Sequence, residues 1–158
     1  MDILKATRIV NLILIILILG ISLFLLGEFD GFREGMFSAY GLDKASYNSE
    51  IVTHGPNFFD SVVRNYSLIA VFSFIYLISR VTRNRCLPSL ISLISLAGIV
   101  FGYCLLFLLK YSIDDSAVLL YRQLLALSLW IDWLGFSTTI IVIILDIVAW
   151  ILLRPEKS

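Results

Sequence analysis

The chain has 158 residues, of which 59% are hydrophobic and 15% are charged. Soluble globular domains contain about 45–50% apolar and about 25% charged residues, and small domains leave a large share of their surface in water. A mean hydropathy of +0.96 therefore excludes an ordinary soluble domain and predicts that lipid surrounds much of the chain. The formal net charge of zero provides no field that would attract nucleic acid, so we expect the lipid bilayer as a partner and no nucleic acid.

Apolar runs predict four membrane-spanning helices. A helix needs roughly 20 apolar residues to cross a hydrocarbon core of about 30 Å, and within that core its backbone groups are satisfied internally. The first run follows Lys5 and Arg8 and is longer than the apolar region of about 7–15 residues that signal peptides have, so we interpret it as a retained span. The predicted spans cover residues 9–26, 60–80, 87–109 and 133–153.

The basic residues predict the orientation of these spans. One side of the membrane would receive a dense set of lysines and arginines, and the other side a sparse set spread over two longer loops, residues 27–59 and 110–132. By the positive-inside rule the dense side is cytosolic. We expect one all-α domain over residues 1–158, a four-helix transmembrane bundle with the N and C termini both in the cytosol. The dense set is Lys5, Arg8, Arg80, Arg83, Arg85, Arg154 and Lys157.

Asp146 is the most unusual residue of the predicted spans. It lies eight residues before Arg154, hence about 12 Å into the fourth span. A carboxylate at such a depth costs on the order of 2.5–3.5 kcal/mol, so it should face the bundle interior and find a partner. Asn11 lies at a comparable depth in the first span, and Arg8 or Arg80 can reach toward it. A structural polar clamp is one interpretation, and a proton or cation relay, or docking to a basic residue of another subunit, is the other.

The third span carries small residues at helical spacing. Gly98 and Gly102 form a GxxxG motif with Ser95 upstream, and such residues let two helix backbones approach closely. We expect these glycines to serve helix packing, either within one bundle or between two copies.

Two further sets of residues are candidates for partner binding or modification. The first outward loop is rich in aromatic residues, which favour packing on a partner or on the membrane surface. Cys86 stands beside the third span among arginines, a position suited to reversible palmitoylation, with an unmodified thiol as the alternative. The candidate partner-binding residues of the loop are Phe29, Phe32, Phe37, Tyr40 and Tyr47.

Motifs of catalysis and metal binding are missing from the sequence. It contains no nucleophile elbow, no phosphate-binding glycine loop and no HExxH. His54 is the only histidine, and the two cysteines, Cys86 and Cys104, do not lie in the outward loops. We therefore predict no catalytic residues, no metal, no cofactor and no disulfide-stapled ectodomain.

The arrangement of four spans, short tails, a tight basic turn and two outward loops resembles tetraspan junction and vesicle proteins. The opening residues 3–12, ILKATRIVNL, look like the first-span entry of MARVEL-type proteins. Claudin-like and arthropod septate-junction tetraspans share the topology, although the first loop lacks the tryptophans and cysteines of claudins. The resemblance implies a role in organising membranes or partners and transfers no site residues.

Two functions from different classes follow from this sequence. The first is a non-enzymatic tetraspan scaffold or accessory subunit, in a junctional or trafficking setting, that binds other membrane protein subunits or itself at the plasma membrane or an endomembrane. The alternative is a small oligomeric channel or transporter protomer that uses Asp146.

Overall fold

The computed structural model describes residues 2–39, 55–82, 88–112 and 122–153. These residues form four helices and no strand. The helices are α1 (Asp2–Ala39), α2 (Gly55–Thr82), α3 (Leu90–Tyr111) and α4 (Arg122–Leu152). The prediction of an all-α protein is therefore confirmed for the described residues, and each of the four helices is long and apolar enough to cross a membrane.

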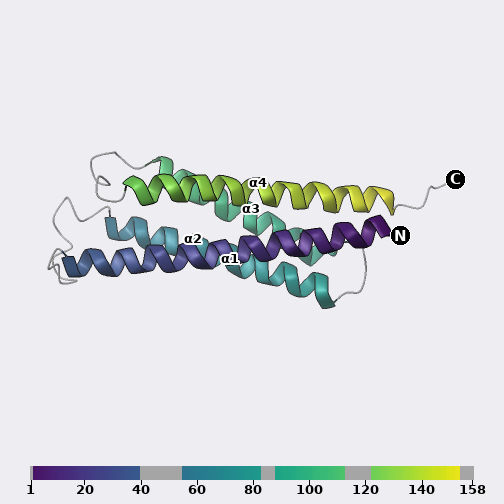
Figure 1. The fold of residues 1–158 in the computed structure, drawn as a ribbon, viewed down its shortest axis with the longest axis horizontal. Helices are drawn as coiled ribbons and strands as arrows, with labels where there is room; N and C mark the ends of the chain where they lie inside the picture. Colours follow the sequence, from purple (N-terminus) through teal and green to yellow (C-terminus); the bar gives the residue numbers. More distant parts are fainter. Residues whose placement is uncertain (1, 40–54, 83–87, 113–121, 154–158) are drawn as a thin grey trace.

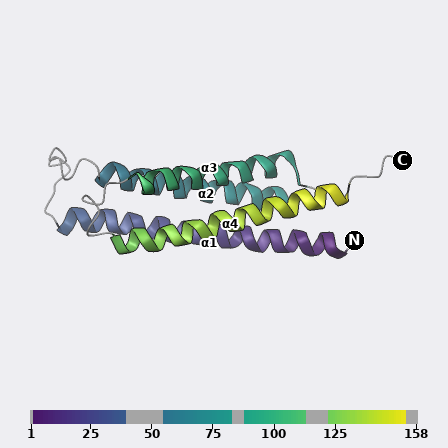
Figure 2. The same cartoon turned by 90° about the horizontal axis from the view of Figure 1, so that it is seen from above.

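The helices run alternately up and down in a four-cornered bundle (Figures 1 and 2). Close backbone contacts follow the perimeter from α1 to α2, α3 and α4 and back to α1. Consequently α2 and α4 face each other across a diagonal. The start of α1 and the end of α4 lie at the same end of the bundle (Figure 1), which we call the terminal end, and the opposite end is the distal end.

Buried positions recur in every helix at alternating spacings of four and three residues. This is the heptad pattern of 3.5 residues per turn, which keeps one seam facing the neighbours when helices supercoil to the left. The apolar faces outside the seams remain exposed, as lipid-facing surfaces require. In α1 the seam is Asn11, Ile15, Ile18, Ser22, Leu25 and Phe29, and in α4 it is Ser128, Asp132, Gly135, Thr139, Val142, Asp146 and Ala149.

The helices extend beyond the predicted spans into both predicted outward loops. α1 continues beyond Leu26 to Ala39, and α4 begins at Arg122, so parts of the expected loops 27–59 and 110–132 are helix. The apolar-run criterion detects only the stretch inside hydrocarbon, whereas a helix ends where its backbone finds a cap or a breaker.

The start of α3 shows such a cap. Ser89 has extended backbone angles and its hydroxyl accepts a hydrogen bond from the backbone N–H of Ser92, 3.2 Å away. An N-cap of this kind satisfies one of the amide groups that a helix leaves open at its first turn. The helix therefore begins at Leu90 and not at residue 87 as predicted.

Candidate functional site

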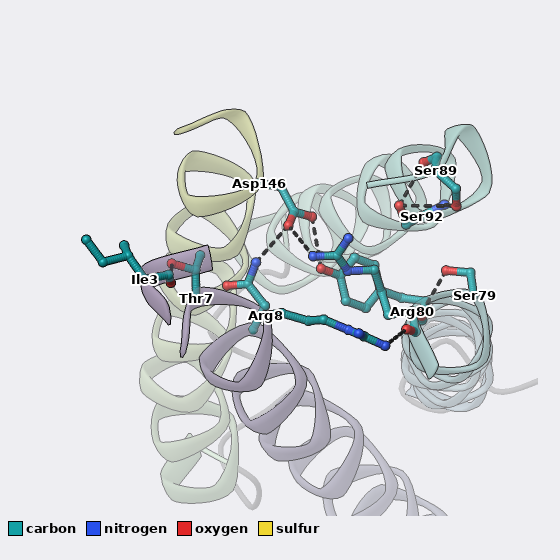
Figure 3. Close-up of polar contacts among 10 residues, drawn as sticks. Ile3, Thr7, Arg8, Ser79, Arg80, Ser89, Ser92 and Asp146 are labelled. Atoms are coloured by element: carbon teal, nitrogen blue, oxygen red, sulfur yellow. Dashed lines mark hydrogen bonds and ion pairs between the residues drawn. The ribbon is translucent and has the colours of Figure 1, made fainter. Parts of the chain in front are cut away.

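The first buried polar cluster surrounds Asp146 at the terminal end of the bundle (Figure 3). Arg80 of α2 forms an ion pair with it, with 3.1 Å between Nη2 and Oδ1. Asn11 of α1 donates from Nδ2 to the same oxygen over 2.8 Å, and Tyr76 of α2 donates its hydroxyl to Oδ2 over 2.9 Å. Asp146 is fully buried, so three donors from two other helices replace the water that its carboxylate has lost.

The sequence places these donors by helical spacing. Tyr76 and Arg80 are four residues apart on α2 and share one face of that helix. Their proximity also sets the Arg80 guanidinium 5.9 Å from the centre of the Tyr76 ring. Arg8 of α1 donates from Nη2 to the backbone carbonyl of Arg80 over 2.7 Å (Figure 3). Because the last carbonyls of a helix have no partner within it, this contact both caps α2 and ties α1 to it.

The second buried polar cluster surrounds Lys110 at the distal end. Lys110 of α3 forms an ion pair with Asp132 of α4, and both side chains are fully buried. Its ammonium also donates to the hydroxyl of Tyr66 over 2.7 Å and to the hydroxyl of Ser128 over 3.0 Å. Tyr66 in turn donates to the other carboxylate oxygen of Asp132 over 2.6 Å. The lysine and the carboxylate are thus linked twice, directly and through a phenol.

Aromatic rings complete this second cluster. The Lys110 nitrogen lies 5.1 Å from the ring centre of Phe29 and 5.0 Å from that of Tyr66. The two rings lie 5.8 Å apart and are tilted by 34°. Since Phe29 belongs to α1, the distal cluster draws on all four helices.

The two clusters share one plan. In each, a carboxylate of α4 binds a tyrosine hydroxyl of α2 across the diagonal of the bundle and a cation, which is Arg80 of α2 in the terminal cluster and Lys110 of the neighbouring α3 in the distal cluster. Asp132 and Asp146 are fourteen residues apart, four turns of helix, so they lie on one face of α4 at levels about 21 Å apart. The charge pairs therefore fix the register of α4 at both ends of the membrane-spanning region.

The energetics of such pairs are asymmetric. Removing a pair as a whole can cost little, because desolvation of two charges offsets their attraction. Removing one partner strands a charge in a medium without water and typically costs about 3–5 kcal/mol. The stability of α4 in the bundle therefore depends on the partners that α2 and α3 provide for its two carboxylates.

The predicted polar and small residues occupy these interior positions. Asn11 and Asp146 contact each other directly, and Arg80 reaches the carboxylate. A Cβ added to Gly98 would lie 2.6 Å from the Phe72 ring, and one added to Gly102 would lie 2.6 Å from Ile69. Both glycines thus face α2 of the same chain. Ser95 is buried beside them and donates to the carbonyl of Ile91 over 2.7 Å.

The structure describes only part of the predicted partner-binding loop. Phe29 was expected on an exposed loop, but it lies in the helical part of α1 and is buried against the distal cluster, which corrects its assignment as a recognition residue. Phe32 and Phe37 belong to α1, and their side chains lie outside the described part of the structure. Tyr40, Tyr47 and Cys86 lie outside the described residues altogether.

The distal cluster was not anticipated from the sequence. Lys110 and Asp132 were assigned to the ends of an outward loop, because each closes an apolar run. The available signal was the spacing: Asp132 precedes Asp146 by two heptads, with Gly135, Thr139 and Val142 on the same stripe. A seam of small and polar residues that continues past the apolar run indicates that the buried face continues as well.

Within the described residues, no three His, Cys, Asp or Glu side chains gather in a way that could hold a metal ion. No protein-family model matches the chain, and no curated protein and no solved structure matches it either. The two clusters are therefore interpreted from their own chemistry.

Proposed function

We propose that this chain is a non-enzymatic tetraspan scaffold or accessory subunit of a membrane complex. The observation that carries the proposal is the closure of both intramembrane charge clusters within one chain. Asp132 and Asp146 are fully buried, and each has a cation and a tyrosine hydroxyl of the same chain as partners. Groups that are held in this way favour a structural role over reaction with a substrate.

The exterior of the bundle suits contact with lipid and with partner helices. Its exposed residues are mainly large and apolar, and at the distal end of α4 Trp130 is 75% exposed. Tryptophan is enriched both at membrane interfaces and in the centres of protein–protein contacts. We propose the distal part of α4 as a recognition surface, together with Phe32, Phe37, Tyr40 and Tyr47, and a cytosolic location for the terminal end.

The test is the mass and composition of the intact particle after mild extraction from the native membrane. The proposal predicts a particle that contains further membrane protein subunits or more than one copy of the chain. A matched pair of variants sharpens it: Trp130→Ala should weaken the association, whereas Phe101→Ala, which removes an exposed ring of α3, should not. A strictly monomeric, partner-free particle from the native membrane would contradict the proposal.

The alternative, a small oligomeric channel or transporter protomer that uses Asp146, stays a prediction. It requires the carboxylate to exchange its partners Arg80, Asn11 and Tyr76 for water or an ion during transport.

A further inference from the structure

The distal cluster matches the chemistry of a primary ammonium group. Such a group has three N–H donors and no acceptor. In the structure the Lys110 ammonium has three acceptors, namely the hydroxyls of Tyr66 and Ser128 and one oxygen of Asp132. All three N–H donors of Lys110 are therefore used, and Asp132, one of the three acceptors, carries the negative charge that balances the ammonium.

Two aromatic faces add to this match. The centres of the Phe29 and Tyr66 rings lie 5.1 and 5.0 Å from the Lys110 nitrogen, within the range in which a ring face attracts a cation. A quaternary ammonium has no N–H for the three acceptors, and a guanidinium is planar with five donors. The geometry thus selects a primary ammonium over the other organic cations.

We propose that Phe29, Tyr66, Ser128 and Asp132, which we call the ammonium cage, form a binding site for primary ammonium groups, and that Lys110 occupies it as a tethered ligand. The ligand that exchanges with Lys110 carries the same group, either as a lipid headgroup with a primary amine or as a small free amine. This binding site goes beyond the proposed scaffold function: the distal cluster is closed while Lys110 occupies the cage, and it opens only during exchange.

The position of Lys110 allows this exchange. It is the last residue but one of α3, and its flexible four-carbon chain can turn toward the membrane surface. A cation also interacts favourably with the C-terminal end of a helix, so Lys110 keeps a suitable place outside the cage. Asp132 stays behind as a buried carboxylate that requires another cation.

We place the cage at the level where lipid headgroups begin. Next to Lys110, the Tyr111 hydroxyl accepts a hydrogen bond from the Trp133 indole over 3.0 Å, and both side chains are exposed. Paired tryptophan and tyrosine side chains of this kind mark the boundary between hydrocarbon and headgroups. A headgroup ammonium is therefore close to the position that Lys110 vacates.

The test empties the cage and refills it. Lys110→Ala removes the tethered ammonium and leaves room for a small amine. Thermal unfolding of this variant in detergent is measured with ethylamine, tetramethylammonium or guanidinium chloride at equal ionic strength. We expect ethylamine to raise the unfolding temperature by several degrees, and the other two cations to leave it unchanged. Equal effects of all three salts, or none from ethylamine, would overturn the ammonium cage.

Two variants serve as matched controls. Asp132→Asn combined with Lys110→Ala removes the charge of the cage, and ethylamine should then have no effect. Arg80→Ala opens the other charge cluster, which binds a guanidinium, and ethylamine should not stabilise it. If Lys110→Ala does not fold alone, recovery of monodisperse protein when ethylamine is present during extraction provides the same readout.

A final experiment separates the two sources of the ligand. The wild-type chain is reconstituted with equal amounts of phosphatidylethanolamine and phosphatidylcholine, and native mass spectrometry counts the lipids that stay bound after extraction. Preferential retention of phosphatidylethanolamine that Asp132→Asn abolishes assigns the site to lipid. Stabilisation by ethylamine without such retention assigns it to a free amine. Absence of both effects contradicts the proposal.

Discussion

At the scale of single residues, this protein places charged side chains in the interior of the bundle, where they have no contact with solvent. Asp146 and Asp132 are tolerated because each accepts hydrogen bonds from groups on other helices and has a cation beside it. The importance of each residue therefore depends on its partner, and single and paired substitutions should behave differently.

Substitution of either partner of the terminal pair should destabilise the bundle. Asp146→Ala or Arg80→Ala strands a buried charge, and we expect each to lower the free energy of unfolding by about 3–5 kcal/mol. The double variant should lose less than the sum of the two, because it strands neither charge. Denaturant or thermal unfolding in detergent measures the cycle. Ile147→Ala, a change at a lipid-exposed neighbour, is the control, and strict additivity would show that the pair is not coupled.

The tyrosine hydroxyl of the distal cluster should also contribute to stability. Tyr66→Phe removes a group that both accepts from Lys110 and donates to Asp132, so we expect a loss of about 1–3 kcal/mol. Tyr111→Phe removes only an exposed hydroxyl that accepts from Trp133, and it should change stability by less than about 0.5 kcal/mol. Unfolding curves of the two variants provide the comparison, and equal losses would argue against the special role of Tyr66.

At the scale of helices, the glycines differ according to what they face. A Cβ at Gly135 would meet the Tyr103 hydroxyl at 2.1 Å, whereas one at Gly20 would meet nothing within 4 Å. Small residues thus serve close packing on α4 and leave open space on one side of α1. Substitution by alanine should therefore have opposite effects on stability at these two positions.

Gly135→Ala should destabilise the bundle by about 1–3 kcal/mol, because the α3–α4 contact has to open to admit the methyl group. Gly20→Ala should be neutral or stabilising by up to about 1 kcal/mol, since alanine is the better helix former. Melting temperatures of the two variants in one detergent measure the effect. A loss of stability in both variants would contradict the open space beside Gly20.

The sequence predicted the existence and type of the helices better than their ends. Four apolar runs correspond to four helices, since helices satisfy their own backbone groups in lipid. The contact between Asn11 and Asp146 could also be predicted from the sequence, because polar groups at equal depth in the membrane have few other partners. Lys110 and Asp132 were assigned to a loop, because a charge that ends an apolar run looks the same whether it faces water or a partner across the bundle. Phe29 was misassigned because it follows the first apolar run, although α1 and its buried seam continue beyond that run.

At the scale of the whole molecule, Lys5, Arg8 and Arg80 lie at the terminal end of the described bundle, and the positive-inside rule predicts that this end is cytosolic. Single cysteines test this orientation in a variant whose own cysteines are replaced. Ser112→Cys, at the distal end, should react with a membrane-impermeant maleimide on intact cells. Thr82→Cys, at the terminal end, should react only after permeabilisation. The reverse pattern would invert the topology.

The structural role of the charged interior is tested most directly by ion flux. The wild-type chain and Asp146→Asn are reconstituted in liposomes, and proton and monovalent-cation flux is measured under a defined gradient. If Asp146 serves to hold α1, α2 and α4 together, flux through the wild-type protein will equal that of empty liposomes, and Asp146→Asn will change only its stability. Flux above that background that Asp146→Asn abolishes, with the fold intact, would contradict this role and establish a channel or transporter.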